Sequence, residues 1–179
     1  KIDTTVAPAS AYLGALGLTT GLTAYFGIVD VGQVKKGDTV VVSGAAGAVG
    51  SVAGQIARLS GASKVIGIAG GAHKSKFLVD DLKFDAAIDY KNENVAARLD
   101  ELAPDGINVF YDNVGGDILD DVLMRIVEGS RIVICGGISQ YENMDDVRGP
   151  KNYMKLAERH ATMEGFAVFH FAEHYARAE

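Results

Sequence analysis

The chain has 179 residues, of which 48% are hydrophobic and 22% charged, so it is long and apolar enough for one packed domain. Its net charge of −6 argues against nucleic acid as the main partner, and no run of about 18 apolar residues indicates a membrane span. Cys135 is the only cysteine, which excludes an internal disulfide and a four-cysteine zinc site. A lone cysteine suits a reducing compartment, so we expect a cytoplasmic protein.

Helical and strand-like patterns alternate along the chain after a small, apolar segment at 11–29 that predicts one or two packed helices. The predicted strands are 39–43, 64–69, 86–89, 107–112, 131–135 and 162–166. The predicted helices are 48–60, 74–82, 95–102, 118–127 and 152–160, with a loop at 136–150. This alternation makes βαβ units, so we predict an α/β fold with a Rossmann-type, doubly wound parallel sheet in three layers, formed by residues 1–179 as a single domain.

The turn after the first predicted strand carries Gly44, Gly47 and Gly50, spaced three residues apart. The first glycine permits a tight turn, the second lets the backbone approach a phosphate, and the third lets helix pack on strand. The first N–H groups of the following helix then face an anion. We therefore predict pyrophosphate binding here, although a turn that only solves packing would have the same glycines.

The end of the second predicted strand lacks the carboxylate that binds the ribose hydroxyls of NAD. Gly70 and Gly71 leave room there, and Lys74 offers a point charge to a 2′-phosphate, although a solvated surface lysine is the simpler alternative. We expect NADP(H) rather than NAD(H) for this reason. Tyr90, just past the third predicted strand, is placed to flank the same phosphate or the adenine, if it is not merely a surface tyrosine.

The fourth and fifth predicted strands also end in glycine-rich segments, at 112–116 and 135–141. Asn113 offers a donor and an acceptor to a ribose or the nicotinamide, and the alternative is an Asx-type turn. Cys135 has no His-and-acid pattern beside it, so we expect a small buried residue rather than a nucleophile. Tyr141 is placed to point into a substrate cavity.

Metal ligands do not form a recognisable set in the sequence. Of the four histidines, only His170 and His174 are four residues apart, and no third ligand accompanies them. No His-Glu-x-x-His, nucleophile-elbow or Walker motif is present. We expect no bound metal.

The motifs, in this order, resemble one known family over nearly the whole chain. The specific pieces are 21–26, 42–51, 67–71 with Lys74, 84–91, 112–116, 135–141 and 163–166. They are similar to the cofactor-binding domain of the zinc-independent medium-chain dehydrogenases/reductases, in particular the leukotriene B4 12-hydroxydehydrogenase/prostaglandin reductase branch. Members of that family begin with a barrel-like domain, which is absent here. The resemblance thus implies a domain excised from a two-domain enzyme and inactive by itself.

The resemblance also implies roles for single residues. Those implied to hold the pyrophosphate and the 2′-phosphate end are Ala48, Val49, Gly50, Gly71, Lys74 and Tyr90, beside the Gly47 already discussed. Those implied to line the ribose and nicotinamide are Thr23, Asn113, Cys135, Ile138, Ser139, Phe166 and Val168. Tyr141 is implied to border the substrate and is a candidate proton donor, together with a ribose hydroxyl of the cofactor.

The activity implied by the resemblance is hydride transfer from NADPH to the C=C bond of an α,β-unsaturated ketone or aldehyde. Such a substrate needs no metal, because its conjugated carbonyl is already electrophilic. A quinone reductase, a zinc-free alcohol dehydrogenase and a nucleotide-binding regulator without chemistry stay open as alternatives. A methyltransferase that uses S-adenosylmethionine is disfavoured, because it requires an acid after the second strand. Family members commonly pair through sheet edges, which makes a homodimer a further expectation.

Overall fold

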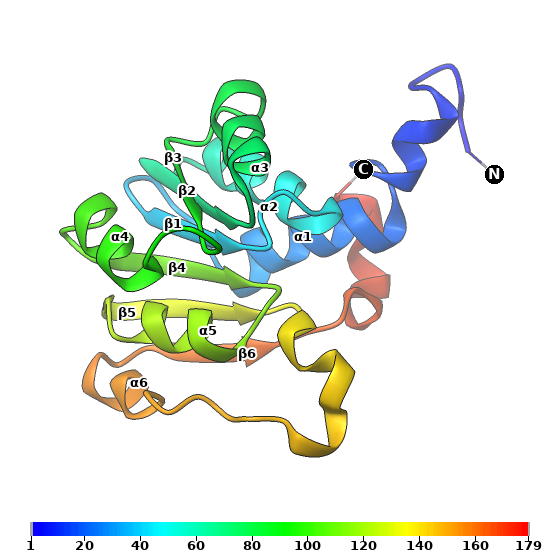
Figure 1. Ribbon diagram of the computed structural model, residues 1–179. Helices are drawn as coiled ribbons and strands as arrows, with labels where there is room; N and C mark the ends of the chain where they lie inside the picture. The colour runs from blue at the N-terminus through cyan, green and yellow to red at the C-terminus, as the bar shows by residue number, and fades with distance from the viewer. Residues whose placement is uncertain (1, 179) are drawn as a thin grey trace.

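The computed structural model describes residues 2–178, apart from the side chain of Asn143, and contains one six-stranded parallel sheet (Figure 1). The strands are β1 (Thr39–Ser43), β2 (Lys64–Ala69), β3 (Ala86–Asp89), β4 (Ile107–Asp112), β5 (Ile126–Ile134) and β6 (Thr162–Gly165). Their order is β3-β2-β1-β4-β5-β6, and every neighbouring pair is parallel. This is the strand order of the doubly wound dinucleotide-binding fold, so the predicted fold class is confirmed.

Helices cover both faces of the sheet (Figure 1). They are α1 (Thr23–Phe26), α2 (Ala48–Leu59), α3 (Ala72–Lys76), α4 (Val95–Leu102), α5 (Gly116–Leu123) and α6 (Met154–Glu158). Other helical turns occupy Ala9–Leu13, Leu18–Leu22, Gly27–Val31, Phe77–Asp81, Ile138–Asp146 and Val168–Arg177. No helix within residues 2–178 combines the length and the apolar character needed to span a bilayer.

The three valines of β1 pack against the helices on both faces of the sheet. Val40 and Val42 belong to a cluster with α1, α2 and the turn after α3, whereas Val41 belongs to a cluster with α4 and α5. All three valines are fully buried, because successive side chains of a strand point to opposite faces. The alternating side chains of β1 therefore pack against helices on both faces of the sheet.

The predicted helix at 118–127 is wrong at both ends. The structure begins α5 at Gly116 and ends it at Leu123, and β5 already starts at Ile126. The apolar residues at 126–127 fit a helical period as well as a strand, but Ile126 pairs with Ile107 of β4. Regular pairing resumes only at Arg131, because Gly129 has a φ of +72° and interrupts the strand. Tertiary pairing therefore overrides the local periodicity.

Close packing of α2 on the turn before β3 depends on a single glycine. A Cβ atom on Gly54 would lie 1.9 Å from Cζ of the buried ring of Phe84. Alanine is the better helix former by about 1 kcal/mol, but overpacking a filled core costs about 1–3 kcal/mol. The steric cost therefore exceeds the gain in helix propensity.

We predict that Gly54→Ala lowers the free energy of unfolding by about 1–2 kcal/mol, measured by urea denaturation. Gln55→Ala, at an exposed position of the same helix, is the matched control and leaves stability nearly unchanged. The double variant Gly54→Ala/Phe84→Leu recovers part of the loss, since the smaller side chain frees the space. An increase in stability for Gly54→Ala alone would contradict the packing argument.

Candidate functional site

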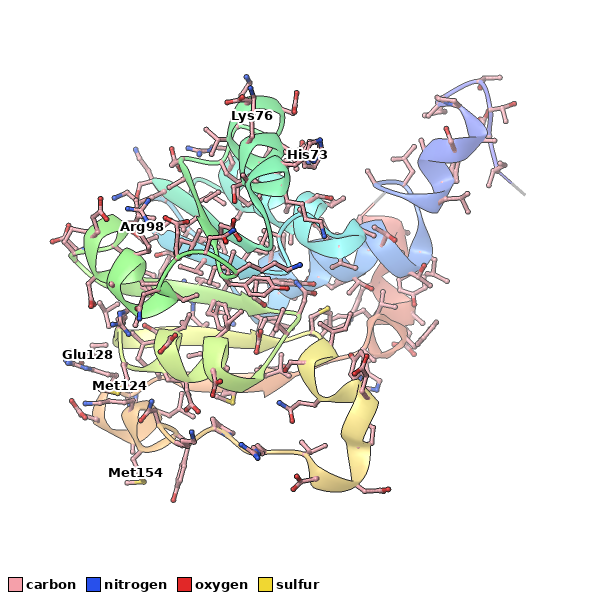
Figure 2. All side chains as sticks on the ribbon, viewed as in Figure 1. His73, Lys76, Arg98, Met124, Glu128 and Met154 are labelled. Carbon is pink, nitrogen blue, oxygen red and sulfur yellow. The ribbon has the colours of Figure 1, made fainter. Side chains whose placement is uncertain are left out.

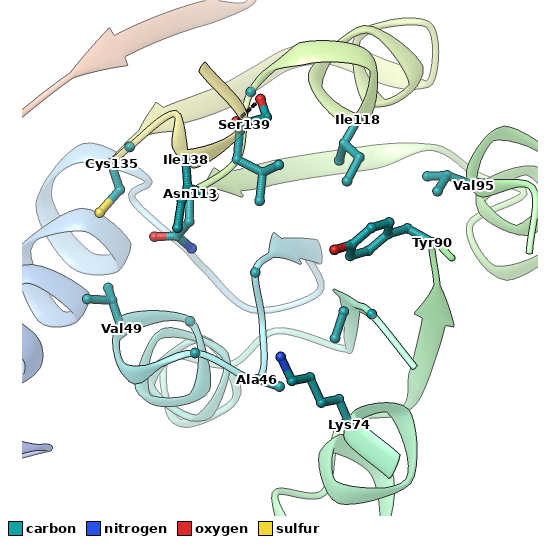
Figure 3. Close-up of a pocket in the computed structure, with 18 of the residues that line it drawn as sticks. Ala46, Val49, Lys74, Tyr90, Val95, Asn113, Ile118, Cys135, Ile138 and Ser139 are labelled. Atoms are coloured by element: carbon teal, nitrogen blue, oxygen red, sulfur yellow. Dashed lines mark hydrogen bonds between the residues drawn. The ribbon is translucent and has the colours of Figure 1, made fainter. Parts of the chain in front are cut away.

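A cavity of about 980 Å³ lies at the carboxyl ends of the central strands (Figure 3). It is centred where β1 and β4 lie side by side, the point at which the strand order reverses. In open α/β sheets this crevice is the usual place for a ligand. Eleven of the fifteen predicted site residues line it, namely Gly47, Ala48, Val49, Gly50, Lys74, Tyr90, Asn113, Cys135, Ile138, Ser139 and Tyr141.

The turn between β1 and α2 forms the floor of the cavity. Gly44 has a φ of +56°, and a Cβ on Gly50 would lie 2.5 Å from the carbonyl oxygen of Gly44. Both positions therefore require glycine, one for its conformation and the other for close approach. Gly47 is the N-cap of α2, and no side chain caps this end of the helix. The N–H groups of the first turn of α2 are thus left to an anion in the cavity.

One end of the cavity carries a cation and a phenol. Figure 3 shows that Lys74, from α3, and Tyr90, from the turn after β3, reach into the same space. A Cβ on Gly70 would lie 2.9 Å from Cε1 of Tyr90, so the tyrosine ring packs against the bare backbone of this glycine. His73 and Lys76 lie on the outer side of α3, away from the sheet (Figure 2). Lys76 is a solvated lysine that pairs with Asp80 at 3.8 Å.

Gly71 does not line the cavity, and its place is taken by Gly70. The N–H of Gly71 donates to Oδ1 of Asp89 at 2.6 Å and is not free for a ligand. Gly71 has a φ of +95°, which explains why a glycine stands there before α3. Its role in the structure is therefore to shape the turn that carries Lys74.

A buried carboxylate organises the middle of the cavity. Asp112 is fully buried and accepts hydrogen bonds from the Ser43 hydroxyl at 2.7 Å and from the N–H groups of Val114 and Gly115. Asn113 donates its side-chain N–H to the carbonyl oxygen of Ser43 at 2.7 Å, which orients the amide at the cavity wall. Asp112, and not Asn113, makes the Asx-type turn, and Asn113 lines the cavity.

Cys135 and Tyr141 line the other end of the cavity, after β5. Burial raises the pKa of the Cys135 thiol, so it is protonated at neutral pH and is not an activated nucleophile. The hydroxyl oxygen of Tyr141 accepts a hydrogen bond from the N–H of Gly137 at 3.1 Å, and the side chain is 57% exposed. Ser139 donates to the carbonyl oxygen of Val114 at 2.6 Å, which joins this loop to the one after β4.

Besides Gly71, three predicted site residues lie outside the cavity lining. The carbonyl oxygen of Thr23 accepts a hydrogen bond from the hydroxyl of Tyr111, and Val168 is buried. Phe166 packs edge-on against Phe171 in the cluster that also includes Cys135. Of the three, Phe166 therefore lies in the same apolar cluster as Cys135.

Part of the cavity wall could not be predicted from the sequence. Val95, at the start of α4, and Ile118, on α5, present apolar side chains to the space beside Tyr90 (Figure 3). Asp117 and Asp121 add carboxylates from the same helix α5. These residues follow different strands, and only the placement of α4 and α5 on the same face brings them together. No group of three or more His, Cys, Asp or Glu side chains within the described residues is arranged to hold a metal ion.

Comparison with protein families gives a match to a model described as zinc-binding dehydrogenase over residues 48–178. The chain belongs to this family. The match begins at the first residue of α2 and runs through all the later elements. It therefore covers most of the residues that line the cavity, whereas Gly44, Ala46 and Gly47 precede the matched range.

Individual relatives are similar to this chain over nearly its whole length. YfmJ of Bacillus subtilis (strain 168) is 50% identical over 98% of this chain and 52% of its own length. The NADP-dependent 2-alkenal reductase of Nicotiana tabacum is 42% identical over 99% of this chain and 51% of its own length. CurA of Vibrio vulnificus, solved in complex with NADPH, superimposes with a TM-score of 0.84 at 42% identity, over 94% of this chain and 50% of that one. The chain thus spans about half the length of these relatives.

The burial of Asp112 predicts a pH dependence of stability. Burial, the largest influence, raises its pKa above the ordinary 3.8, although the bonds from Gly115, Ser43 and Val114 act in the opposite direction. The folded protein therefore holds this proton more tightly than the unfolded chain, and stability falls as pH rises through the interval between the two pKa values.

We predict that the free energy of unfolding of the parent, relative to Asp112→Asn, decreases as pH rises from about 4 toward 7. The difference between the two proteins isolates this group from all others that titrate. Urea denaturation at a series of pH values measures it. A constant difference, or one that grows with pH, would contradict the raised pKa.

Proposed function

We propose that this chain is the NADP(H)-binding domain of a zinc-independent oxidoreductase that reduces the C=C bond of α,β-unsaturated ketones and aldehydes. The observation that carries the proposal is the pair Lys74 and Tyr90 at the end of the cavity beside β2 and β3. A lysine and a phenol suit a 2′-phosphate, whereas an NAD site has a carboxylate in this region. The 2-alkenal reductase and the NADPH complex of CurA support the same cofactor and substrate class.

The residues of the cavity fit this cofactor. The uncapped start of α2 suits a pyrophosphate, and a Cβ at Gly50 would collide with the turn that approaches it. We assign the remaining cofactor contacts around the ribose and nicotinamide to Asn113, Cys135, Ile138 and Ser139, which line the cavity. For Thr23, Phe166 and Val168, which lie outside its lining, we propose a supporting role at the same end of the cofactor. Gly71 is assigned to the turn that carries Lys74 rather than to direct contact.

NADPH, when bound, supplies the hydride for the reduction. The chain's own contribution at the reacting end is to exclude water and to provide a proton donor. Tyr141 fits the second task, because its oxygen already accepts the N–H of Gly137 and its own O–H remains to be donated to the carbonyl oxygen of the substrate. We propose that the reaction requires no zinc, because the conjugated carbonyl of the substrate is already electrophilic.

The setting of the domain is also part of the proposal. Because the relatives are about twice as long, we propose that further chain completes the substrate cleft and that the domain alone does not turn over substrate. A cytoplasmic enzyme fits the lone, protonated Cys135. The outer edge of β6 has no strand partner within the described residues, and we propose it as the site of homodimer formation.

Cofactor selectivity tests the proposal directly. We expect this chain to bind NADPH more tightly than NADH in a calorimetric titration, and Lys74→Ala to weaken NADPH binding by about 10- to 100-fold through loss of a charge-assisted hydrogen bond. NADH binding is expected to stay within about twofold. Lys76→Ala, on the outer side of the same helix, is the matched control and leaves both affinities unchanged. Equal affinities for NADPH and NADH in the parent would refute the assignment of the 2′-phosphate.

The full-length protein tests the substrate class. We expect NADPH oxidation with α,β-unsaturated ketones and aldehydes, and we expect Tyr141→Phe to lower kcat by about 10- to 100-fold, with NADPH affinity unchanged. Steady-state kinetics and the calorimetric titration separate these two effects. Turnover with quinones or alcohols alone would favour the other oxidoreductases of this fold. Cofactor binding without any turnover would favour a regulator.

A further inference from the structure

The turns after β2 and β3 meet at one buried carboxylate. Asp89, the last residue of β3, pairs in register with Ala69, the last residue of β2. Its side chain is only 6% exposed and does not line the cavity. Both strand ends lead directly into the residues that reach the cavity, Lys74 on one side and Tyr90 on the other. Asp89 thus lies between the two groups without facing the ligand.

The oxygens of Asp89 bind the backbone of both turns. Oδ1 accepts the N–H of Gly71 at 2.6 Å and the N–H of Lys91 at 3.1 Å, and Oδ2 accepts the side-chain N–H of Asn92 at 2.7 Å. The bond from Gly71, followed by that from Asn92, lowers the pKa of Asp89, so the carboxylate is ionised at neutral pH. Its negative charge is therefore compensated by hydrogen-bond donors and turned away from the cavity.

The bond to Gly71 fixes the position of Lys74. Gly71 is the N-cap of α3, and its carbonyl oxygen accepts the N–H of Lys74 at 3.0 Å. The helix continues from α3 into the turn Phe77–Asp81, where buried Leu78 anchors its far end in the core. The bond from Gly71 to Asp89 anchors the opposite end, the first turn that carries Lys74.

The bond to Lys91 acts on the opposite turn in the same way. Tyr90 is held between the carbonyl oxygen of Ala69, which accepts its N–H at 3.1 Å, and Lys91, whose N–H donates to Asp89. The ring of Tyr90 then packs over Gly70, where any side chain would displace it. The side chain of Asp89 therefore holds both turns, the one that leads to Lys74 and the one that carries Tyr90.

On these contacts, and resting on the proposed function, we infer that Asp89 is a positioning residue that sets NADPH selectivity by holding Lys74 and Tyr90 around one point. Substitution of Asp89 does not remove Lys74 or Tyr90, but it lowers the fraction of molecules in which these two side chains converge on the 2′-phosphate. The apparent affinity for a 2′-phosphate falls by that fraction, whereas the pyrophosphate contacts at α2 do not depend on Asp89. Loss of Asp89 therefore lowers the ratio of NADPH to NADH affinity, whereas the pyrophosphate contacts that both cofactors share are kept.

Calorimetric titration of this chain with NADPH and with NADH tests the inference. We expect Asp89→Ala to lower the ratio of NADPH to NADH affinity by about tenfold, mainly through weaker NADPH binding. Asp89→Asn keeps an oxygen acceptor for the N–H of Gly71, and we expect it to retain the ratio within about threefold. Asn92→Ala, at an exposed position, removes one of the three donors and is expected to lower the ratio in the same direction by a smaller factor.

The matched control lies at the other end of the same strand. Asp85 accepts the N–H of Val65 at 2.6 Å and pairs with Arg58, so Asp85→Ala also removes a carboxylate that bonds neighbouring backbone. It is expected to lower the melting temperature and to leave the selectivity ratio unchanged. The inference is overturned if Asp89→Ala and Asn92→Ala both keep the ratio of the parent, or if Asp85→Ala loses it equally. Failure of the proposed function is distinct, because the parent chain would then show no preference for NADPH.

Discussion

The hydrogen bond between Ser43 and Asp112 joins the carboxyl ends of β1 and β4, where the strand order of the sheet reverses. It brings the glycine turn before α2 against the turn that carries Asn113, so that a Cβ on Gly44 would lie 3.4 Å from Cβ of Asn113. A fully buried carboxylate is costly unless its oxygens are satisfied, and here a hydroxyl and two backbone N–H groups satisfy them. The width and the floor of the cavity depend on this contact.

A second buried carboxylate that binds neighbouring turns lies at the end of β3. Asp89 and Asp112 are each the last residue of a strand, and each accepts backbone N–H groups from the turns that surround it. Because the strands are parallel, their ends lie at one edge of the sheet, and the two carboxylates brace successive parts of one cavity. Neither carboxylate belongs to the cavity lining, so the acids shape the site while the lysine, the phenol and the N–H groups face into it.

The protein is acidic overall, with a net charge of −6, yet the proposed ligand is a polyanion. The attraction must therefore be local, since the field of the whole molecule does not favour an anion. The start of α2 and Lys74, which both line the cavity, supply it at short range with donors that are already oriented. Asp117 and Asp121 on α5 add negative charge to another part of the wall, which confines the favourable potential to the phosphate-binding parts.

Local sequence determined the alternation of strands and helices, the glycine spacing of the first turn and the presence of Lys74 where an acid is usual. These features are local because burial imposes a period of two on strands and of about 3.6 on helices, and because tight turns require glycine wherever they occur. The same reasoning missed the start of β5, since residues 126–127 satisfy both periods.

Only the tertiary structure decided which residues share the cavity. Val95 and Ile118 enter it, Gly70 replaces Gly71, and Phe166 lies outside the lining, although nothing near these residues in the sequence distinguishes them. The wall is assembled from the ends of several strands, and strand order and register place residues far apart in the chain side by side. Long-range pairing of this kind leaves no periodic signal, because it depends on the sheet as a whole rather than on the segment that carries the residue.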